Sequence, residues 1–184
     1  MSLVRGEEPM SLLRRHLPHD FDPEDFLIAG SARLSVDGII RRSSDLDLLA
    51  RPGSKTWQRM LDLAFEHASI FENAPLRTSG YTGEKIALLY GGAIEVCETW
   101  VVPGTGTELL LDQADVIEGL KYLSICEVVA YKLVLNRKKD FADLSAICGR
   151  PQSSDGRSPI NSEPCEAVVW QPYCHGGRHG NPTA

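Results

Sequence analysis

Short apolar runs, each closed by glycine, proline or polar residues, divide the chain into strand-like and helix-like segments. Residues 26–29 (Phe-Leu-Ile-Ala) are a continuous apolar run that ends at Gly30-Ser31, which predicts a short buried strand followed by a sharp turn. Residues 45–49 alternate polar and apolar positions, as a half-buried strand does. The pattern therefore predicts two early strands, joined by a short helical turn and a polar loop.

The middle of the chain predicts a long helix followed by a β-hairpin. Ser54 stands where an N-cap is expected for a helix that runs from Lys55 to about Ala68. Residues 85–90 and 93–98 have strand-like patterns on either side of a Gly-Gly pair, which is a hairpin signal. The inward face of the long helix is expected to use Trp57, Met60, Leu61, Ala64 and Phe65.

The two ends of the chain differ in character from this middle. Residues 1–20 have leucines at helical spacing, and residues 112–148 carry long helical periodicity with a break expected near 136–139. Residues 150–184 are rich in Pro, Ser, Gly, Asn and His, so we expect a largely disordered tail. This divides the chain into a core at 1–110, a helical segment at 111–149 that packs on the core, and a low-complexity tail at 150–184.

Composition limits the class of protein. The chain has 184 residues, of which 42% are apolar and 24% charged, as in a soluble globular domain. Its net charge of −6 means that a polyanionic substrate must be held by a local basic patch or through metal ions. No apolar stretch reaches membrane-spanning length and no signal peptide is evident, so we expect a cytoplasmic protein without a membrane partner.

The segment from Gly30 to Asp47 contains the candidate metal-binding and phosphate-binding residues. Side chains alternate along a strand, so Asp45 and Asp47 are predicted to point to the same face. Two carboxylates this close repel each other unless a cation lies between them, and Mg²⁺ prefers such oxygen ligands together with substrate phosphates. Gly30 lets the backbone turn tightly, and Ser31 offers donors to a phosphate.

A second metal ion would require a third carboxylate on a neighbouring strand. Glu95, in the alternating run at 93–98, is the candidate. Together with Asp45 and Asp47 it would complete a site for metal-assisted phosphoryl transfer.

Two motifs resemble a known family. The pattern that runs from Gly30-Ser31 through Arg41 and Ser43 to Asp45-Leu46-Asp47 resembles the signature of the DNA polymerase β-like nucleotidyltransferase superfamily. Residues 132–144 (KLVLNRKKDFADL) are similar to a helical segment of the AbiEii-type toxin nucleotidyltransferases and their relatives. The two motifs together span roughly residues 26–148.

This resemblance implies an α/β (α+β) nucleotidyltransferase fold, with a mixed sheet flanked by helices, and a Mg²⁺-dependent reaction. A nucleotide would pass from an NTP, such as ATP, to a hydroxyl of RNA, protein or a small molecule, in a toxin–antitoxin or phage-defence setting with a cognate toxin or antitoxin partner. Gly30, Ser31, Arg41 and Ser43 would belong to the nucleotide site. Lys132 would reach the triphosphate, and Asp140 would orient that lysine or the metal site.

Less specific interpretations accompany each of these residues. An Asp-x-Asp pair on a strand is most often a solvated strand face, and Glu95 is equally an exposed strand carboxylate. Lys132 is also explained as a helix lysine whose stem is buried, and Asp140 as a residue that caps a basic helix. The sequence departs from the family in having Glu at position 95, where Asp is common, and in its short folded region. Both departures favour an alternative, a degenerate member that acts only as a binding or antitoxin-like partner.

Overall fold

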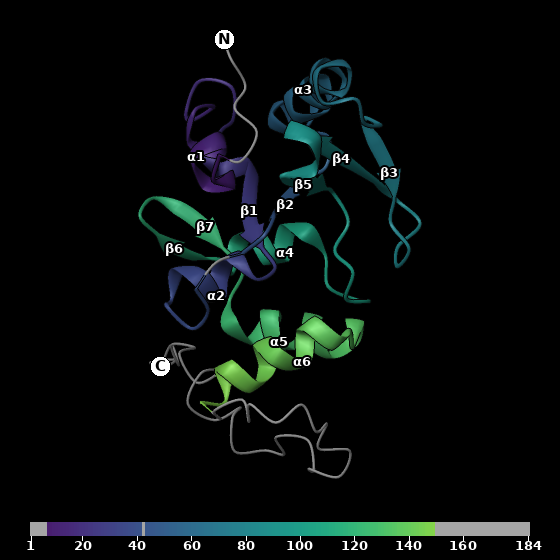
Figure 1. The fold of residues 1–184 in the computed structure, drawn as a ribbon. Helices are drawn as coiled ribbons and strands as arrows, with labels where there is room; N and C mark the ends of the chain where they lie inside the picture. Colours follow the sequence, from purple (N-terminus) through teal and green to yellow (C-terminus); the bar gives the residue numbers. More distant parts are fainter. Residues whose placement is uncertain (1–6, 42, 150–184) are drawn as a thin grey trace, which may run out of the picture.

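A mixed β-sheet forms the centre of the computed structural model, which describes residues 7–41 and 43–149. Its strands in these residues are β1 (Phe26–Ala29), β2 (Leu46–Ala50), β3 (Leu76–Thr78), β4 (Lys85–Leu89), β5 (Ile94–Cys97), β6 (Asp115–Ile117) and β7 (Leu120–Tyr122). They lie in the order β3-β4-β5-β2-β1-β7-β6 (Figure 1). The pairs β2–β5 and β1–β7 are parallel and the others antiparallel.

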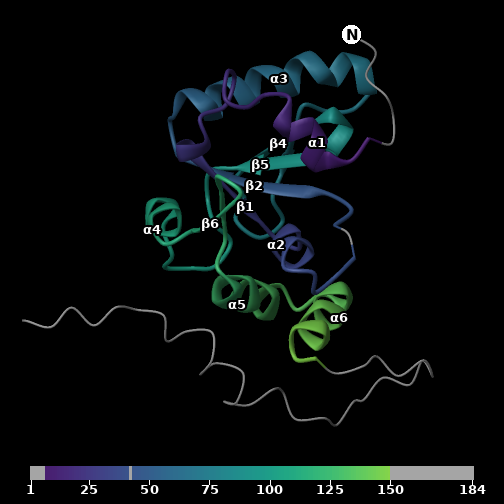
Figure 2. The same ribbon diagram turned by 90° about the vertical axis from the view of Figure 1, so that its left-hand side faces the viewer.

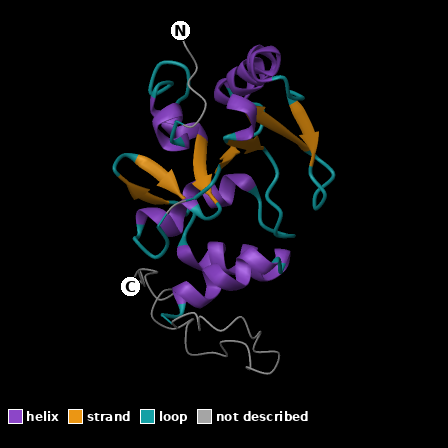
Figure 3. Cartoon of the chain, in the orientation of Figure 1, coloured by secondary structure: helices purple, strands orange, loops and turns teal. Residues whose placement is uncertain are grey.

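Helices cover both faces of the sheet. They are α1 (Pro9–Arg14), α2 (Ala32–Val36), α3 (Lys55–Phe71), α4 (Thr107–Asp112), α5 (Ile125–Leu135) and α6 (Lys138–Ile147), with short 3₁₀ turns η1 (Pro23–Asp25) and η2 (Tyr90–Gly92). Figure 2 shows α1 and α3 on one side of the sheet and α2, α4, α5 and α6 on the other. The predicted α/β class, with a mixed sheet between helices, is confirmed (Figure 3).

The alternation of side chains in β1 and β2 divides the core into two parts. Phe26 and Ile28 pack with Leu48 in the cluster under α3. Leu27 and Leu49 belong to the cluster on the opposite face, which α2, α4 and α5 cover. Because alternate residues share a face, the odd-numbered positions of β2 point toward the α5 layer.

Helix α3 follows the predicted pattern with one exception. The Ser54 side chain accepts a hydrogen bond from the Trp57 backbone N–H at 3.0 Å, so the predicted N-cap is confirmed. Phe65, expected on the inward face, is 58% exposed. Leu63 and His67 are buried instead. The apolar stripe is thus displaced around the helix from the expected one, because the helix rests on the strands through residues 60, 63, 64 and 67.

A hairpin interrupts the segment expected to be helical throughout residues 112–148. Strands β6 and β7 occupy 115–117 and 120–122, and the intervening Glu118 and Gly119 both have positive φ, 49° and 78°. Two-residue hairpin turns of this kind usually contain Asn-Gly or Asp-Gly, so the Glu-Gly sequence did not predict a turn here. Strand β7 pairs with β1 and so adds the hairpin to the central sheet.

The break expected near residues 136–139 is confirmed. Helix α5 ends at Leu135, Asn136 is left-handed with φ 49°, and α6 begins at Lys138. The proposed tail at 150–184 and the first residues of the N-terminal lead-in lie outside the described residues. Within the described ranges, every helix is too short or too polar to cross a membrane.

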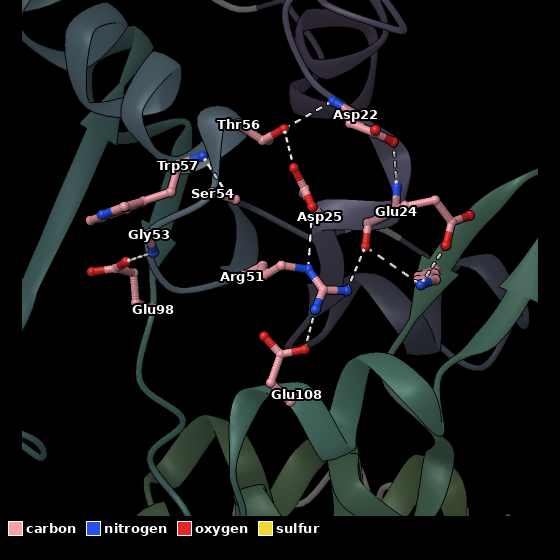
Figure 4. Close-up of polar contacts among 11 residues, drawn as sticks. Asp22, Glu24, Asp25, Arg51, Gly53, Ser54, Thr56, Trp57, Glu98 and Glu108 are labelled. Carbon is pink, nitrogen blue, oxygen red and sulfur yellow. Dashed lines mark hydrogen bonds and ion pairs between the residues drawn. The ribbon is translucent and has the colours of Figure 1, made fainter.

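A polar cluster ties the far end of β2 to three other segments (Figure 4). Arg51, directly after β2, donates from Nε to Asp25 at 3.2 Å and from Nη1 to Glu108 at the start of α4. Asp25 also accepts from the Thr56 hydroxyl at 3.1 Å, which links η1 to α3. Arg51 thus anchors the end of β2 opposite to Asp45 and Asp47.

Replacing Arg51 should destabilise the fold more than replacing an arginine of an exposed ion pair. We expect Arg51→Met to lower the free energy of unfolding by about 1–2 kcal/mol, because Asp25 is left partly buried with fewer donors. Arg14→Met removes a well-exposed pair with Glu118 and should cost at most about 0.5 kcal/mol. Urea denaturation followed by circular dichroism measures both, and equal losses would contradict the anchoring role.

Candidate active site

Strand register places two of the predicted carboxylates side by side. Asp47 on β2 is the direct partner of Glu95 on β5 in a parallel pair. The flanking residues Leu48 and Val96 belong to the cluster under α3, so Asp47 and Glu95 share the opposite face, on which α5 lies. Neighbouring strands are about 4.8 Å apart, which brings the two carboxylates within reach of a common ligand.

Asp45 lies just before β2 rather than on it, because the strand begins at Leu46. The Ser44 hydroxyl donates to its carboxylate at 2.9 Å, and the Ser43 hydroxyl donates to its backbone carbonyl at 2.7 Å. Ser43, predicted to belong to the nucleotide site, therefore shapes the entry into β2. Asp45 remains close enough for its charge to act on both Asp47 and Glu95.

The turn after β1 lies directly against Asp47. Ala29 is the register partner of Asp47, and Gly30 follows with φ +64°. A Cβ added to Gly30 would lie 2.2 Å from Oδ2 of Asp47, so any other residue at this position would force the Asp47 carboxylate to move. Glycine is thus required here both for its backbone conformation and for its close approach to the carboxylate.

A buried lysine fixes this turn to the two C-terminal helices. Lys132 of α5 is 0% exposed, and its ammonium donates to the Ser31 hydroxyl at 2.9 Å and to Asp143 of α6 at 2.6 Å. The Ser31 hydroxyl in turn donates to Asp143 at 2.9 Å. Asp140 lies 3.5 Å from the same ammonium. Ser31 thus joins three residues from a distant part of the sequence, Lys132, Asp140 and Asp143, in one closed polar network.

The role expected of Lys132 differs from the one that this geometry favours. A lysine that reaches a triphosphate needs a free ammonium, whereas the ammonium of Lys132 is buried and paired with Asp143 and Asp140. In the structure it connects α5 and α6 to the Gly30–Ser31 turn. The burial arises because α5 packs on the sheet through the face that carries Val128, Lys132 and Leu135.

The start of α6 is held by a second pair. Asp140 accepts from the Arg137 backbone N–H at 3.0 Å and from its guanidinium at 2.7 and 3.0 Å. Arg137 also donates to the Tyr131 hydroxyl at 3.1 Å. Burial alone would raise the pKa of Asp140, but hydrogen bonds and charge from Arg137, with the charge of Lys132, bring that pKa below its usual range. Asp140 is therefore a capping and orienting carboxylate.

Burial and mutual repulsion make the ionised forms of Asp47 and Glu95 unfavourable in the absence of a cation. Burial raises the pKa of Asp47, and the charge of Asp45 raises it further, while Lys139, Arg137 and Lys132 oppose the shift. Burial also raises the pKa of Glu95, with added repulsion from Asp47 and Asp45. Among the described residues, no group donates a hydrogen bond to the carboxylate of Asp47. A bound cation would relieve the repulsion and supply the missing partner.

The donor set suits one magnesium ion better than two. Two carboxylates and substrate phosphates are a usual magnesium environment. Asp45 and Asp47 would supply hard oxygen donors, and Asp47 lies against the Gly30 turn. In the described ranges, no three Asp, Glu, His or Cys side chains are arranged so that they alone could hold a metal ion. Glu95 is already paired with Arg77 of β3.

Arg41 lies apart from the site, Arg77 and Tyr131 were missed in the sequence, and the contact of Asp143 was not foreseen. Arg41 is exposed and forms no ion pair with the described residues. Arg77 was missed because β3 has three residues, too few for a strand pattern. Tyr131 lacks a motif of its own. Asp143 was noted in the helical motif, but its contact with Ser31 depends on how α6 folds back, which no local pattern encodes.

The chain matches no protein-family model, no curated protein and no solved structure. The resemblance in its two motifs, together with the geometry above, is what bears on its function.

Removing the buried ammonium tests the network. Lys132→Met should lower the free energy of unfolding by about 3–5 kcal/mol, because Asp143 and Asp140 lose their shared cation in a desolvated site. Lys138→Met, at an exposed position of the same helix pair, should change it by less than about 0.5 kcal/mol. Chemical denaturation measures both. A Lys132→Met protein as stable as the Lys138→Met protein would show that the network is not structural.

Proposed function

We propose that this chain is a magnesium-dependent nucleotidyltransferase of the polymerase-β-like fold. It would transfer a nucleotide from an NTP to a hydroxyl of RNA, protein or a small molecule. The observation that carries the proposal is the position of Asp47, whose carboxylate accepts no hydrogen bond from the described residues and lies in contact with the Gly30 turn and beside Glu95. A cation and a phosphate both fit the chemistry of that place.

Each residue then has a defined task. Asp45 and Asp47 hold the divalent ion, which offsets phosphate charge and assists ionisation of the attacking hydroxyl. Gly30 lets phosphate oxygens approach the backbone above Asp47. Lys132 is a positioning residue, because it holds Ser31 and with it the turn.

A different lysine is suited to the phosphates. Lys139 in the first turn of α6 is exposed and has no ion-pair partner among the described residues. Its charge acts on both Asp47 and Glu95, so it lies near the carboxylates. The network around Lys132 fixes α6 in this position. Lys139 would therefore balance the triphosphate charge.

The alternative is a degenerate, non-catalytic member that acts as a binding or antitoxin-like partner. The ion pair between Glu95 and Arg77 favours it, because a neutralised Glu95 is a poor metal ligand. A toxin–antitoxin or phage-defence setting, with a cognate partner protein, is proposed on the motif resemblance alone.

Incubation with each of the four α-labelled NTPs, Mg²⁺, and total RNA or protein tests the activity. We expect label to appear in one acceptor class and to fall about 1,000-fold or more in Asp47→Asn, since the ion's charge stabilisation is worth several kcal/mol. Asp47→Asn should remain folded, because none of residues 7–41 and 43–149 donates a hydrogen bond to this carboxylate and its repulsion from Asp45 disappears.

Labelling with none of the four NTPs, or equal labelling by the wild type and a folded Asp47→Asn protein, would favour the non-catalytic alternative. Asp62→Asn, on the distant helix α3, is the matched control and should label as the wild type does.

Separate substitutions of two neighbouring lysines test whether Lys139 binds the triphosphate. Lys139→Gln should raise KM for the NTP about tenfold, because one charge-assisted contact to the triphosphate is lost. Lys138→Gln, which removes the same charge one residue away, should leave KM within about twofold. Steady-state kinetics measures both, and equal effects would reduce the role of Lys139 to general surface charge.

A further inference from the structure

Arg77 reaches the carboxylate site from an edge of the sheet. It lies on β3, which is separated from β5 by β4 in the strand order. Its guanidinium nevertheless forms an ion pair with Glu95. The arginine thus spans the intervening strand on the sheet face that carries Asp47 and Glu95.

The two partners differ in their surroundings. The Glu95 side chain is 16% exposed and that of Arg77 is 52% exposed. Glu95 is held by its place in the sheet, between β2 and β4. In the part of the chain that the structure describes, strand β3 pairs only with β4, over three residues. Arg77 is therefore the partner that can move away from the pair without disturbing the core.

The charge balance explains why an arginine lies here. Asp45, Asp47 and Glu95 repel one another, and the positive charge of Arg77 opposes the rise in the pKa of Glu95 that burial and repulsion produce. A guanidinium does not lose its proton in proteins, so it supplies a permanent positive charge. It stands at the carboxylate that a second divalent ion would need.

We propose that Arg77 is an internal counter-ion that takes the place of a second divalent cation at Glu95. The nucleotide-free protein then binds one divalent ion, at Asp45 and Asp47, and a second ion enters only when the guanidinium leaves Glu95. Arg77 in this way sets the metal content of the site. The inference rests on the proposed function, since it assumes that Asp45 and Asp47 hold a metal ion.

A titration of the purified full chain with Mn²⁺ in the absence of nucleotide tests the proposal. Electron paramagnetic resonance measures the free Mn²⁺ at each point. We expect about one bound Mn²⁺ per chain in the wild type and about two in Arg77→Gln. Arg77→Gln/Glu95→Gln should return to about one, because the added ion needs the Glu95 carboxylate.

Lys85→Gln is the matched control. Lys85 belongs to the same β3–β4 hairpin and carries the same charge, but it contacts Thr78 rather than Glu95. It should bind about one Mn²⁺, as the wild type does. Circular dichroism of each variant verifies folding, and Arg77→Met provides a second substitution at this exposed position.

Two contrary results separate this inference from the proposed function. The role of Arg77 would be overturned by either of two results: about two bound Mn²⁺ in the wild type, or about one in both Arg77 variants. If Asp47→Asn then binds none, the metal site at Asp45 and Asp47 is still supported. No binding to the wild type or to any variant would overturn the metal site itself, and the inference with it.

Discussion

The buried ammonium of Lys132 is the interaction on which the rest of the site depends. It joins the Gly30–Ser31 turn after β1 to α6 through Asp143, with Asp140 close by. A buried charge is tolerated only when carboxylates and a hydroxyl surround it, and the closed network with Ser31 meets that demand. Helix α6, which carries Lys139, is thereby held beside the strand that carries Asp47.

The second constraint is strand register. A half-buried sheet gives every other residue to one face, and β2 and β5 are paired so that Asp47 and Glu95 meet on the side of α5. A slip of β2 by one residue would turn Asp47 toward the apolar cluster under α3 and away from Glu95. The core that specifies this register therefore also assembles the acidic site.

Local patterns in the sequence predicted the parts of the fold that local chemistry determines. The cap at Ser54, the end of β1 at Gly30 and the break after Leu135 each depend on a few adjacent residues. The hairpin at 115–122 was not predicted, because Glu-Gly is an uncommon sequence for a turn whose two residues are left-handed. The contacts of Arg77 with Glu95 and of Lys132 with Ser31 depend on tertiary packing, which periodicity does not encode.

We propose that Asp45 and Asp47, the latter in contact with the Gly30 turn, hold a divalent ion beside a bound NTP. A crystal structure of the chain with Mn²⁺ and a non-hydrolysable NTP analogue tests it most directly. An anomalous peak about 2 Å from carboxylate oxygens of Asp45 and Asp47, with the triphosphate against Gly30 and Ser31, is the expected result. A nucleotide bound elsewhere, or carboxylates without metal at saturating Mn²⁺, would contradict it.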